Sequence, residues 1–139
     1  MASKQQMTGM RGVYLVAAEL SKLGFIASPT SRSAIGADIL VTDQACKTTF
    51  SVQVKTNART FNFWLLTSKA KEQISKSHIY VLVNLRKNKS GETIEYFVVP
   101  SGVISDKMVH SKNKNSEWWS IYLKNVEQHR DKWSIFGVV

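Results

Sequence analysis

The sequence predicts a single α/β domain in which a mixed central sheet carries helices on both faces. Three observations predict this class. Apolar residues recur at helical spacing over residues 11–23, residues 49–56 alternate strictly between apolar and polar side chains, and residues 78–85 form a nearly unbroken apolar run. These patterns are typical of an amphipathic helix, a half-buried strand and a strand buried on both faces, respectively.

The first half of the chain reads as one helix followed by strands. Gly24 ends the helix, and we expect residues 1–9 to precede it as a partly disordered segment. The following elements are expected in this order: strand 25–27, loop 29–34, strand 37–42, turn 43–47 and strand 49–56. The last two strands would form a hairpin, which brings their side chains onto shared faces.

The second half alternates between helices and strands. Ser68 is a suitable N-cap for a helix over residues 68–77. Pro100 ends the strand expected at 93–99, and Ser101 can cap the short helix that follows. The expected elements are loop 57–63, strand 64–66, helix 68–77, strand 78–85, turn 86–91, strand 93–99, helix 101–110, loop 111–116, strand 118–123 and a helix or turn at 126–133. This order predicts helices on both sides of one sheet.

Composition limits the class of protein. The 139 residues suit one domain spanning 1–139, and 43% hydrophobic residues suffice for a core. The single cysteine, Cys46, excludes an internal disulfide and a cysteine-rich zinc site. The chain has no apolar run near the roughly 20 residues that span a bilayer and no signal-like N-terminus. We therefore expect a cytoplasmic protein without a membrane partner.

The charge balance favours a polyanionic partner. Nineteen basic and ten acidic residues give a net charge of +9, which would attract nucleic acid. The lysines do not collect on one amphipathic helix, so a membrane surface is a weaker candidate. A basic surface that only aids solubility is the simpler alternative.

Candidate site residues come from the polar face of strand 49–56. Gln53 and Lys55 share that face, and burying a lysine ammonium without a partner costs several kcal/mol. An open cleft with anionic partners would avoid this cost. Asp38 on the preceding strand and Glu19 at the edge of the helix's apolar face are the nearest candidates.

Each of these residues also has an ordinary structural interpretation. Asp38 would serve as a turn cap at the start of its strand. Gln53 and Lys55 would form an exposed sheet face, and Glu19 would be a carboxylate on the helix surface.

Two short segments carry a resemblance to a known family. Gly36-Ala37-Asp38-Ile39, followed by Val52-Gln53-Val54-Lys55-Thr56 on the next strand, resembles the PD-(D/E)XK nuclease-like superfamily. In that family an Asp precedes an acid-x-Lys strand, and an earlier helix often donates a Glu. The likeness covers about residues 10–85 and is greatest to the Holliday-junction-resolvase-like branch and to small uncharacterised members with Gln-x-Lys. It implies the restriction-endonuclease-like α/β/α sandwich.

The resemblance implies an endonuclease that hydrolyses DNA phosphodiester bonds with Mg²⁺ or Mn²⁺ as its metal ion. Asp38, the amide oxygen of Gln53, the backbone carbonyl of Val54 and Glu19 would hold the ion, and Lys55 would orient the attacking water. Gln53 replaces the usual acidic residue and removes one negative charge, which weakens the site for a hard cation. A catalytically silent nucleic-acid-binding or interaction module on the same fold therefore stays open. Small members of such families often form homodimers.

Polar residues around the motif are candidate contacts to the nucleic acid, and a loop of hydroxyls with a guanidinium suits phosphate. These residues are Ser31, Arg32, Ser33, Thr56, Asn57 and Arg59. The tryptophans would stack on bases if exposed, but in a domain this small we interpret them mainly as core residues. The three histidines show no ligand spacing and are interpreted as structural or surface residues.

Overall fold

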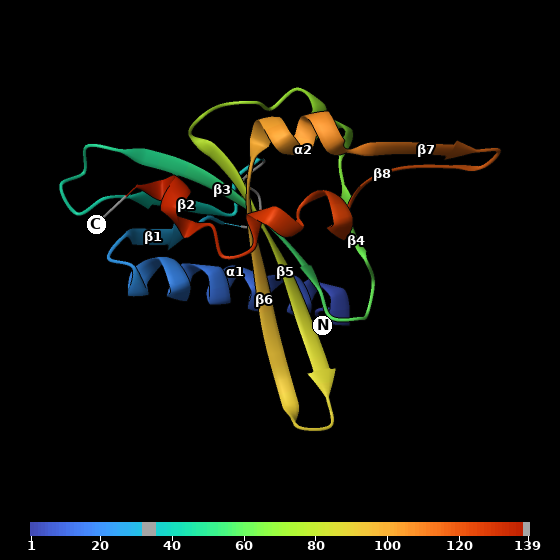
Figure 1. Ribbon diagram of the computed structural model, residues 1–139, viewed down its shortest axis with the longest axis horizontal. Coiled ribbons are helices and arrows are strands. Elements are labelled where there is room, and N and C mark those ends of the chain that lie inside the picture. Colours follow the sequence, from blue (N-terminus) through green and yellow to red (C-terminus); the bar gives the residue numbers. More distant parts are fainter. Residues whose placement is uncertain (32–35, 138–139) are drawn as a thin grey trace.

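The computed structural model describes residues 1–31 and 36–137 (Figure 1). Its helices and strands, in chain order, are α1 (Lys4–Lys22), β1 (Ile26–Pro29), β2 (Ile39–Thr42), β3 (Thr49–Asn57), β4 (Phe63–Leu66), β5 (His78–Asn88), β6 (Gly91–Pro100), α2 (Ser101–Lys107), β7 (Val109–Asn113) and β8 (Ser116–Tyr122). Short 3₁₀ helices lie at Ser68–Lys71, Leu123–Asn125, Glu127–His129 and Trp133–Phe136. Within the described part of the chain, no helix is long and apolar enough to cross a membrane.

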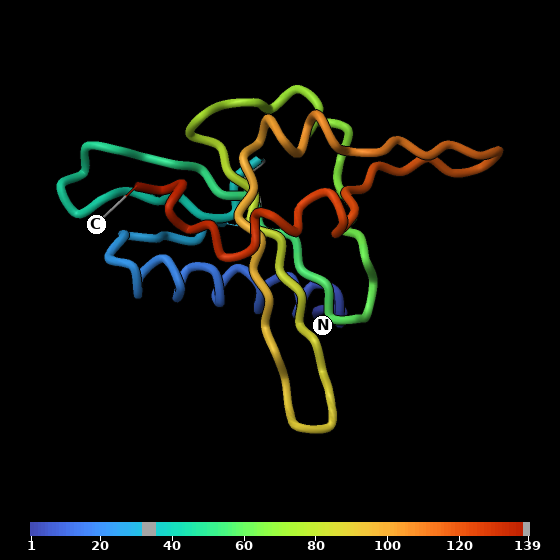
Figure 2. Tube along the Cα trace, in the orientation of Figure 1, coloured from blue at the N-terminus to red at the C-terminus, as the bar shows by residue number. Residues whose placement is uncertain are grey.

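The strands form two sheets. The main sheet has the order β1-β2-β3-β5-β6. Strands β3 and β5 pair in parallel, and the other neighbouring strands of this sheet pair antiparallel. The predicted mixed sheet and the hairpin of β2 and β3 are thereby confirmed. A smaller antiparallel sheet has the order β4-β8-β7. The β5–β6 and β7–β8 hairpins project from the body of the domain (Figure 2).

Alternation along β3 divides the core into two layers. Val52 and Val54 pack with Val16 and Leu20 of α1 on one face of the main sheet. On the other face, Tyr80 and Leu82 of β5 join a second cluster, with Trp64 of β4, Ile104 of α2 and Ile121 of β8 among its other members. Helices therefore lie on both faces, as expected, but the second face is covered mainly by the small sheet together with α2 (Figure 1).

The first helix begins earlier than the sequence pattern indicated. Ser3 caps it: its hydroxyl accepts a hydrogen bond from the Gln6 N–H, and the Gln6 side chain accepts one from the Ser3 N–H. This reciprocal capping box satisfies two backbone N–H groups at the helix start, those of Ser3 and Gln6. Residues expected to be partly disordered thus form the first turns of α1, because a cap can start a helix ahead of its apolar stripe.

Two predicted helices are shorter than expected: the helix at 101–110 ends at Lys107, and the helix at 68–77 is reduced to one turn. The helix expected at 68–77 is one 3₁₀ turn at Ser68–Lys71, because Ile74 stays exposed and the Ser75 hydroxyl bonds the Ser77 backbone instead. The helix or turn expected at 126–133 is present as 3₁₀ turns, and the Asp131 N–H donates to the Tyr96 carbonyl of β6. The loop expected at 111–116 is a hairpin, since β7 pairs with β8 up to Asn113 and Ser116.

Gly12 sets the distance between α1 and the main sheet. A Cβ built on this residue would overlap the Thr56 hydroxyl of β3, so the helix can approach β3 only where it has no side chain. Gly9, one turn earlier, has nothing within 4 Å of the same position.

We expect Gly12→Ala to lower the free energy of unfolding by about 1–3 kcal/mol, because the close approach would be overpacked. Gly9→Ala is the matched control and should raise it by up to about 1 kcal/mol through helix propensity. Urea unfolding measures both changes. Equal effects at the two glycines would contradict close packing at Gly12, whereas recovery in a Gly12→Ala, Thr56→Ala double variant would support it.

Candidate active site

Asp38 lies against the backbone of β3. Its N–H donates to the Val52 carbonyl at 2.8 Å, and its Oδ2 accepts a hydrogen bond from the Val54 N–H at 2.8 Å. The N–H and C=O of one strand residue point to the same side of the strand. The Val54 carbonyl therefore faces the same side of β3 as Asp38.

Lys55 is the next residue along β3 and is half-buried. Burial lowers the pKa of its ammonium below 10.5, and the nearby Asp38 carboxylate opposes this shift. The structure thus brings Asp38 and Lys55 close enough for their charges to interact. Because burial outweighs the carboxylate, the ammonium is only partly compensated.

Two aromatic residues that sequence analysis did not select adjoin this group. Tyr80 of β5 lies opposite Gln53 in the parallel register, and burial together with the Asp38 charge raises the pKa of its hydroxyl. His78 lies opposite Ser51, whose hydroxyl is 2.7 Å from Nδ1; burial lowers the pKa of this imidazole and favours its neutral form. Both residues lie in the nearly unbroken apolar run of β5, which indicated only a buried strand. Their place beside β3 follows from the parallel register.

Glu19 is not brought to this group. A cavity of about 440 Å³ beside Asp38 and Val54 is lined by α1 residues from its first half, including Gln6, Met10 and Tyr14. Glu19 lies farther along, where its carboxylate is 4.0 Å from Lys22 and its charge raises the pKa of Tyr96 on β6. A helical wheel gives the direction of a side chain but not its position along the axis, and each residue advances it by about 1.5 Å.

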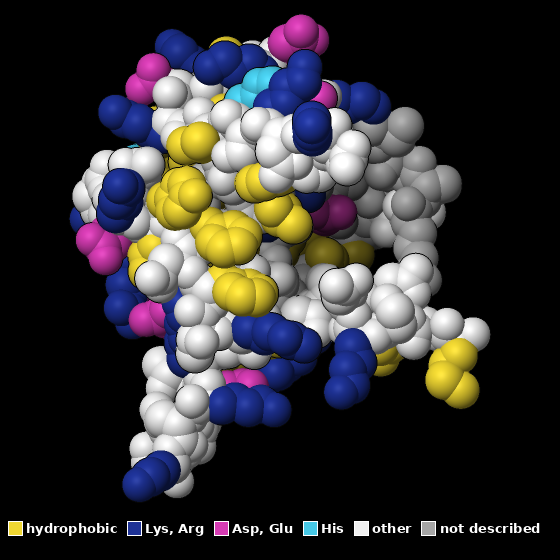
Figure 3. Space-filling model, turned by 90° about the vertical axis from the view of Figure 1, so that its right-hand side faces the viewer, with side chains coloured by type: hydrophobic (Ala, Val, Ile, Leu, Met, Phe, Trp, Pro, Cys, Tyr) yellow, Lys and Arg dark blue, Asp and Glu magenta, His cyan; other side chains and the backbone are white. Residues whose placement is uncertain are grey.

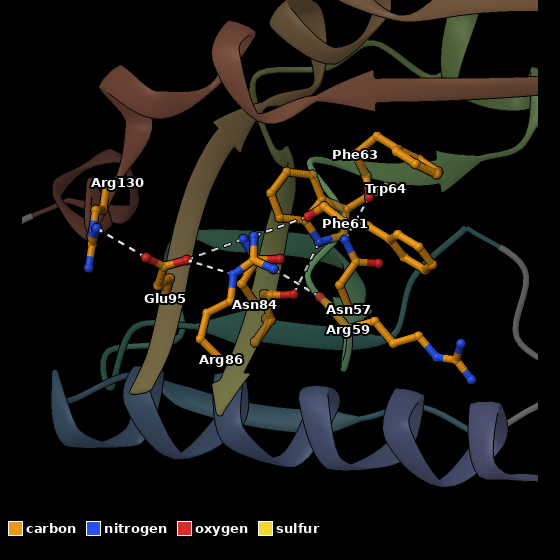
Figure 4. A network of polar contacts seen from close by, with 10 residues as sticks. Asn57, Arg59, Phe61, Phe63, Trp64, Asn84, Arg86, Glu95 and Arg130 are labelled. Atoms are coloured by element: carbon orange, nitrogen blue, oxygen red, sulfur yellow. Dashed lines mark hydrogen bonds and ion pairs between the residues drawn. The ribbon is translucent and has the colours of Figure 1, made fainter. Parts of the chain in front are cut away.

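The expected nucleic-acid contacts separate into different environments. Thr56 faces α1 and packs on Gly12, and its Oγ1 is buried, which does not favour the expected phosphate contact. Period-two alternation puts Thr56 with Val52 and Val54. Asn57 Nδ2 donates to the Phe63 carbonyl at 2.6 Å and so holds a loop. Arg59 is exposed, and Figure 4 shows its side chain extending away from the neighbouring polar contacts.

The loop before Asp38 is described in part. Ser31 lines the same cavity as Asp38. Arg32 and Ser33 lie outside the described residues.

The donor set suits a hard divalent cation, though weakly. The Asp38 carboxylate, the Val54 carbonyl and the Gln53 amide would all offer oxygen, which Mg²⁺ prefers. Only one of these groups carries a negative charge. Among residues 1–31 and 36–137, no three His, Cys, Asp or Glu side chains are grouped to hold a metal ion.

Comparison with known proteins places the fold. No family model matches the chain, and no curated protein does. Among solved structures, that of Hjc, a Holliday junction resolvase from the archaeal hyperthermophile Archaeoglobus fulgidus, matches with a TM-score of 0.60 and 15% identity over 94% of this chain and 97% of that chain. The match confirms the predicted fold class, the restriction-endonuclease-like α/β fold around a mixed sheet.

We expect Lys55→Met to raise the melting temperature of the metal-free protein at pH 7. The lowered pKa means that the folded protein binds this proton less tightly than the unfolded chain, so stability rises with pH between the lowered pKa and 10.5. The gain from Lys55→Met should therefore shrink as the pH approaches 10.5.

Thermal melts in EDTA at neutral and alkaline pH measure this difference. Lys22→Met is the matched control, since the Lys22 side chain is 78% exposed, and it should change little. A lower melting temperature for Lys55→Met at pH 7 would show that Asp38 more than compensates the burial of Lys55.

Proposed function

We propose that this protein is a divalent-metal-dependent nuclease that hydrolyses DNA phosphodiester bonds, acting as an endonuclease. The observation that carries the proposal is the arrangement on β3: Asp38 is fixed by the Val54 N–H, and the half-buried Lys55 follows directly. The fold that it shares with Hjc supports the proposal.

Asp38, the Val54 carbonyl and the Gln53 amide would hold Mg²⁺ or Mn²⁺. When bound, the ion would polarise a phosphoryl oxygen and lower the pKa of a water molecule. The bond from the Val54 N–H holds the Asp38 carboxylate in one orientation before any ion arrives. Such preorganisation reduces the cost of assembling the site.

Lys55 would orient the attacking water and offset charge that develops on the phosphate. Its ammonium has lost part of its hydration, and Asp38 compensates this loss incompletely. A DNA phosphate would supply the missing negative charge, and charge interactions are stronger away from bulk water. Tyr80, whose raised pKa keeps its hydroxyl protonated, lies next to Gln53 and would donate a hydrogen bond there.

DNA is the proposed substrate. The net charge of +9 favours a polyanion, and the structure that matches the fold is that of a resolvase of Holliday junctions. We therefore include branched DNA among the substrates to be tested. A homodimer and a cytoplasmic location stay predictions.

A second candidate is a catalytically silent DNA-binding module on the same fold. Gln53 favours it, because a neutral amide stands where the related motif carries an acid. The two candidates differ in cleavage but not in binding, and both require an affinity that falls as salt rises.

We expect Mg²⁺- or Mn²⁺-dependent cleavage of plasmid or branched DNA, reduced about 100-fold or more by Asp38→Asn and by Lys55→Ala. Gel assays of initial rates measure this. Glu19→Gln is the matched carboxylate control and should keep its activity, because Glu19 lies elsewhere on α1. Salt-sensitive binding without cleavage would favour the silent module, and no binding at low salt would contradict both candidates.

Gln53→Glu should tighten metal binding by roughly tenfold, because a carboxylate adds a negative charge to an oxygen site. Titration of the protein with Mn²⁺ by calorimetry measures the change directly. Gln128→Glu adds the same charge at an exposed position and should leave the affinity unchanged. Equal effects of both variants would show that Gln53 is not a ligand.

A further inference from the structure

A row of apolar side chains, four of them exposed and Phe63 half-buried, lies on the outer face of the β4-β8-β7 sheet. Phe63 lies opposite Tyr122 in the register, with their ring centroids 6.0 Å apart, and Phe61 stacks on Phe63 at 5.3 Å. Leu65 and Trp118 share this face by period-two alternation. We call these five residues the aromatic face: Phe61, Phe63, Leu65, Trp118 and Tyr122.

The inner face of the same sheet already fills the core. Trp64, Leu66 and Ile121 point inward and are buried, so folding does not require the aromatic face. Leu65 nevertheless remains 57% exposed and Phe61 45% exposed. Figure 3 shows hydrophobic side chains gathered on this side of the molecule, with Lys and Arg around them. A gathered apolar surface of this kind marks an interaction site.

A polar network holds the start of the aromatic face in place (Figure 4). Arg86 of β5 donates from Nη1 to the Arg59 carbonyl at 2.9 Å and from Nη2 to the Phe61 carbonyl at 3.0 Å. Glu95 of β6 lies 3.5 Å from Arg86 Nε and 3.3 Å from Arg130 Nη1. Because carbonyls within the loop are bonded to the main sheet, the rings of Phe61 and Phe63 would lose little conformational freedom on binding.

Positive charge accompanies the rings. Lys124 Nζ lies 5.9 Å from the centroid of the Tyr122 ring, and the Arg59 side chain extends outward two residues before Phe61 (Figure 4). Aromatic rings beside cations match a ligand that alternates flat, apolar rings with negative charges. An unpaired nucleic-acid strand has this chemistry, since its bases stack on aromatic side chains while its phosphates meet Lys and Arg.

We propose that the aromatic face binds single-stranded DNA. A duplex hides the faces of its bases, so the surface would select unpaired strands. The alternative occupant, a second copy of this chain, would place the same patch against itself. Lys124 and Arg59 would then approach their own copies, and like charges oppose such a contact.

The aromatic face adjoins the candidate active site. Asn57 follows Lys55 by two residues on β3 and donates to the Phe63 carbonyl, so β3 links the two surfaces directly. In the choice of DNA, this inference rests on the proposed function. In all other respects it goes beyond that function, because stacking needs neither a metal ion nor Lys55.

The test is fluorescence anisotropy of a labelled oligothymidine and of a duplex of equal length, measured in EDTA so that no strand is cut. We expect tighter binding of the single strand. Phe61→Ala and Tyr122→Ala should each weaken it roughly tenfold, and Phe61→Leu, which keeps an apolar side chain, should also weaken it. Leu40→Ala, at another residue that is more than half exposed, is the matched control and should bind as the wild type does.

Several results would overturn the proposal. These are wild-type affinity in the Phe61 and Tyr122 variants, equal weakening by Leu40→Ala, or no preference for the single strand. A dimer that Tyr122→Ala converts to a monomer, with oligothymidine affinity unchanged, would assign the face to a second copy. The proposed hydrolysis is scored separately. Lys55→Ala should reduce cleavage in Mg²⁺ about 100-fold or more while keeping the single-strand affinity within about twofold, because it removes at most one phosphate contact.

Discussion

The parallel pairing of β3 with β5 is the constraint on which the rest of this structure depends. Seven residue pairs, from Ser51–His78 to Asn57–Asn84, align the two central strands. In this register one face of the central strands packs on α1 and the other packs on the second layer. Each face is covered by its own apolar cluster. The same register sets Gln53 beside Tyr80. The pairing that builds the sheet therefore also decides which β5 residues lie next to the candidate site.

The candidate site combines fixed geometry with an unfavourable charge. The Asp38 carboxylate is held by a backbone N–H of β3, whereas the Lys55 ammonium is half-buried with incomplete compensation. Structural needs alone would favour an apolar side chain at Lys55. Retaining a partly desolvated cation next to an oriented carboxylate is typical of a site that receives a charged ligand. The neutral Gln53 is the feature that limits how strongly a cation would be held.

Polar residues of the main sheet bind the segment at residues 59–63, which leads into β4 of the small sheet. Arg86 of β5 donates to the carbonyls of Arg59 and Phe61 beside β4, and Glu95 of β6 forms an ion pair with Arg86. Asn57 adds a bond from β3 to Phe63. The small sheet is therefore tied to the main one by side chain to backbone bonds as well as by its buried inner face. Its outer face remains available, which distinguishes Phe61 and Tyr122 from Trp64.

The sequence by itself determined the fold class and most of the strands, because alternation along a strand and pairing in a hairpin are local. It also predicted a group of Asp38, Gln53, Val54 and Lys55, of which the structure brings Asp38 to Val54 and Lys55. The alternation of side chains along β3 also puts Thr56 on the same face as Val52, although its hydroxyl suggested a phosphate contact. Only the tertiary structure decided that Glu19 lies apart from Asp38, that residues 68–77 form one 3₁₀ turn instead of an α-helix, and that His78 and Tyr80 lie opposite Ser51 and Gln53. Each of these three features depends on where one helix or strand meets another along its length. The periodicity of a sequence predicts the direction of a side chain but not that point of contact.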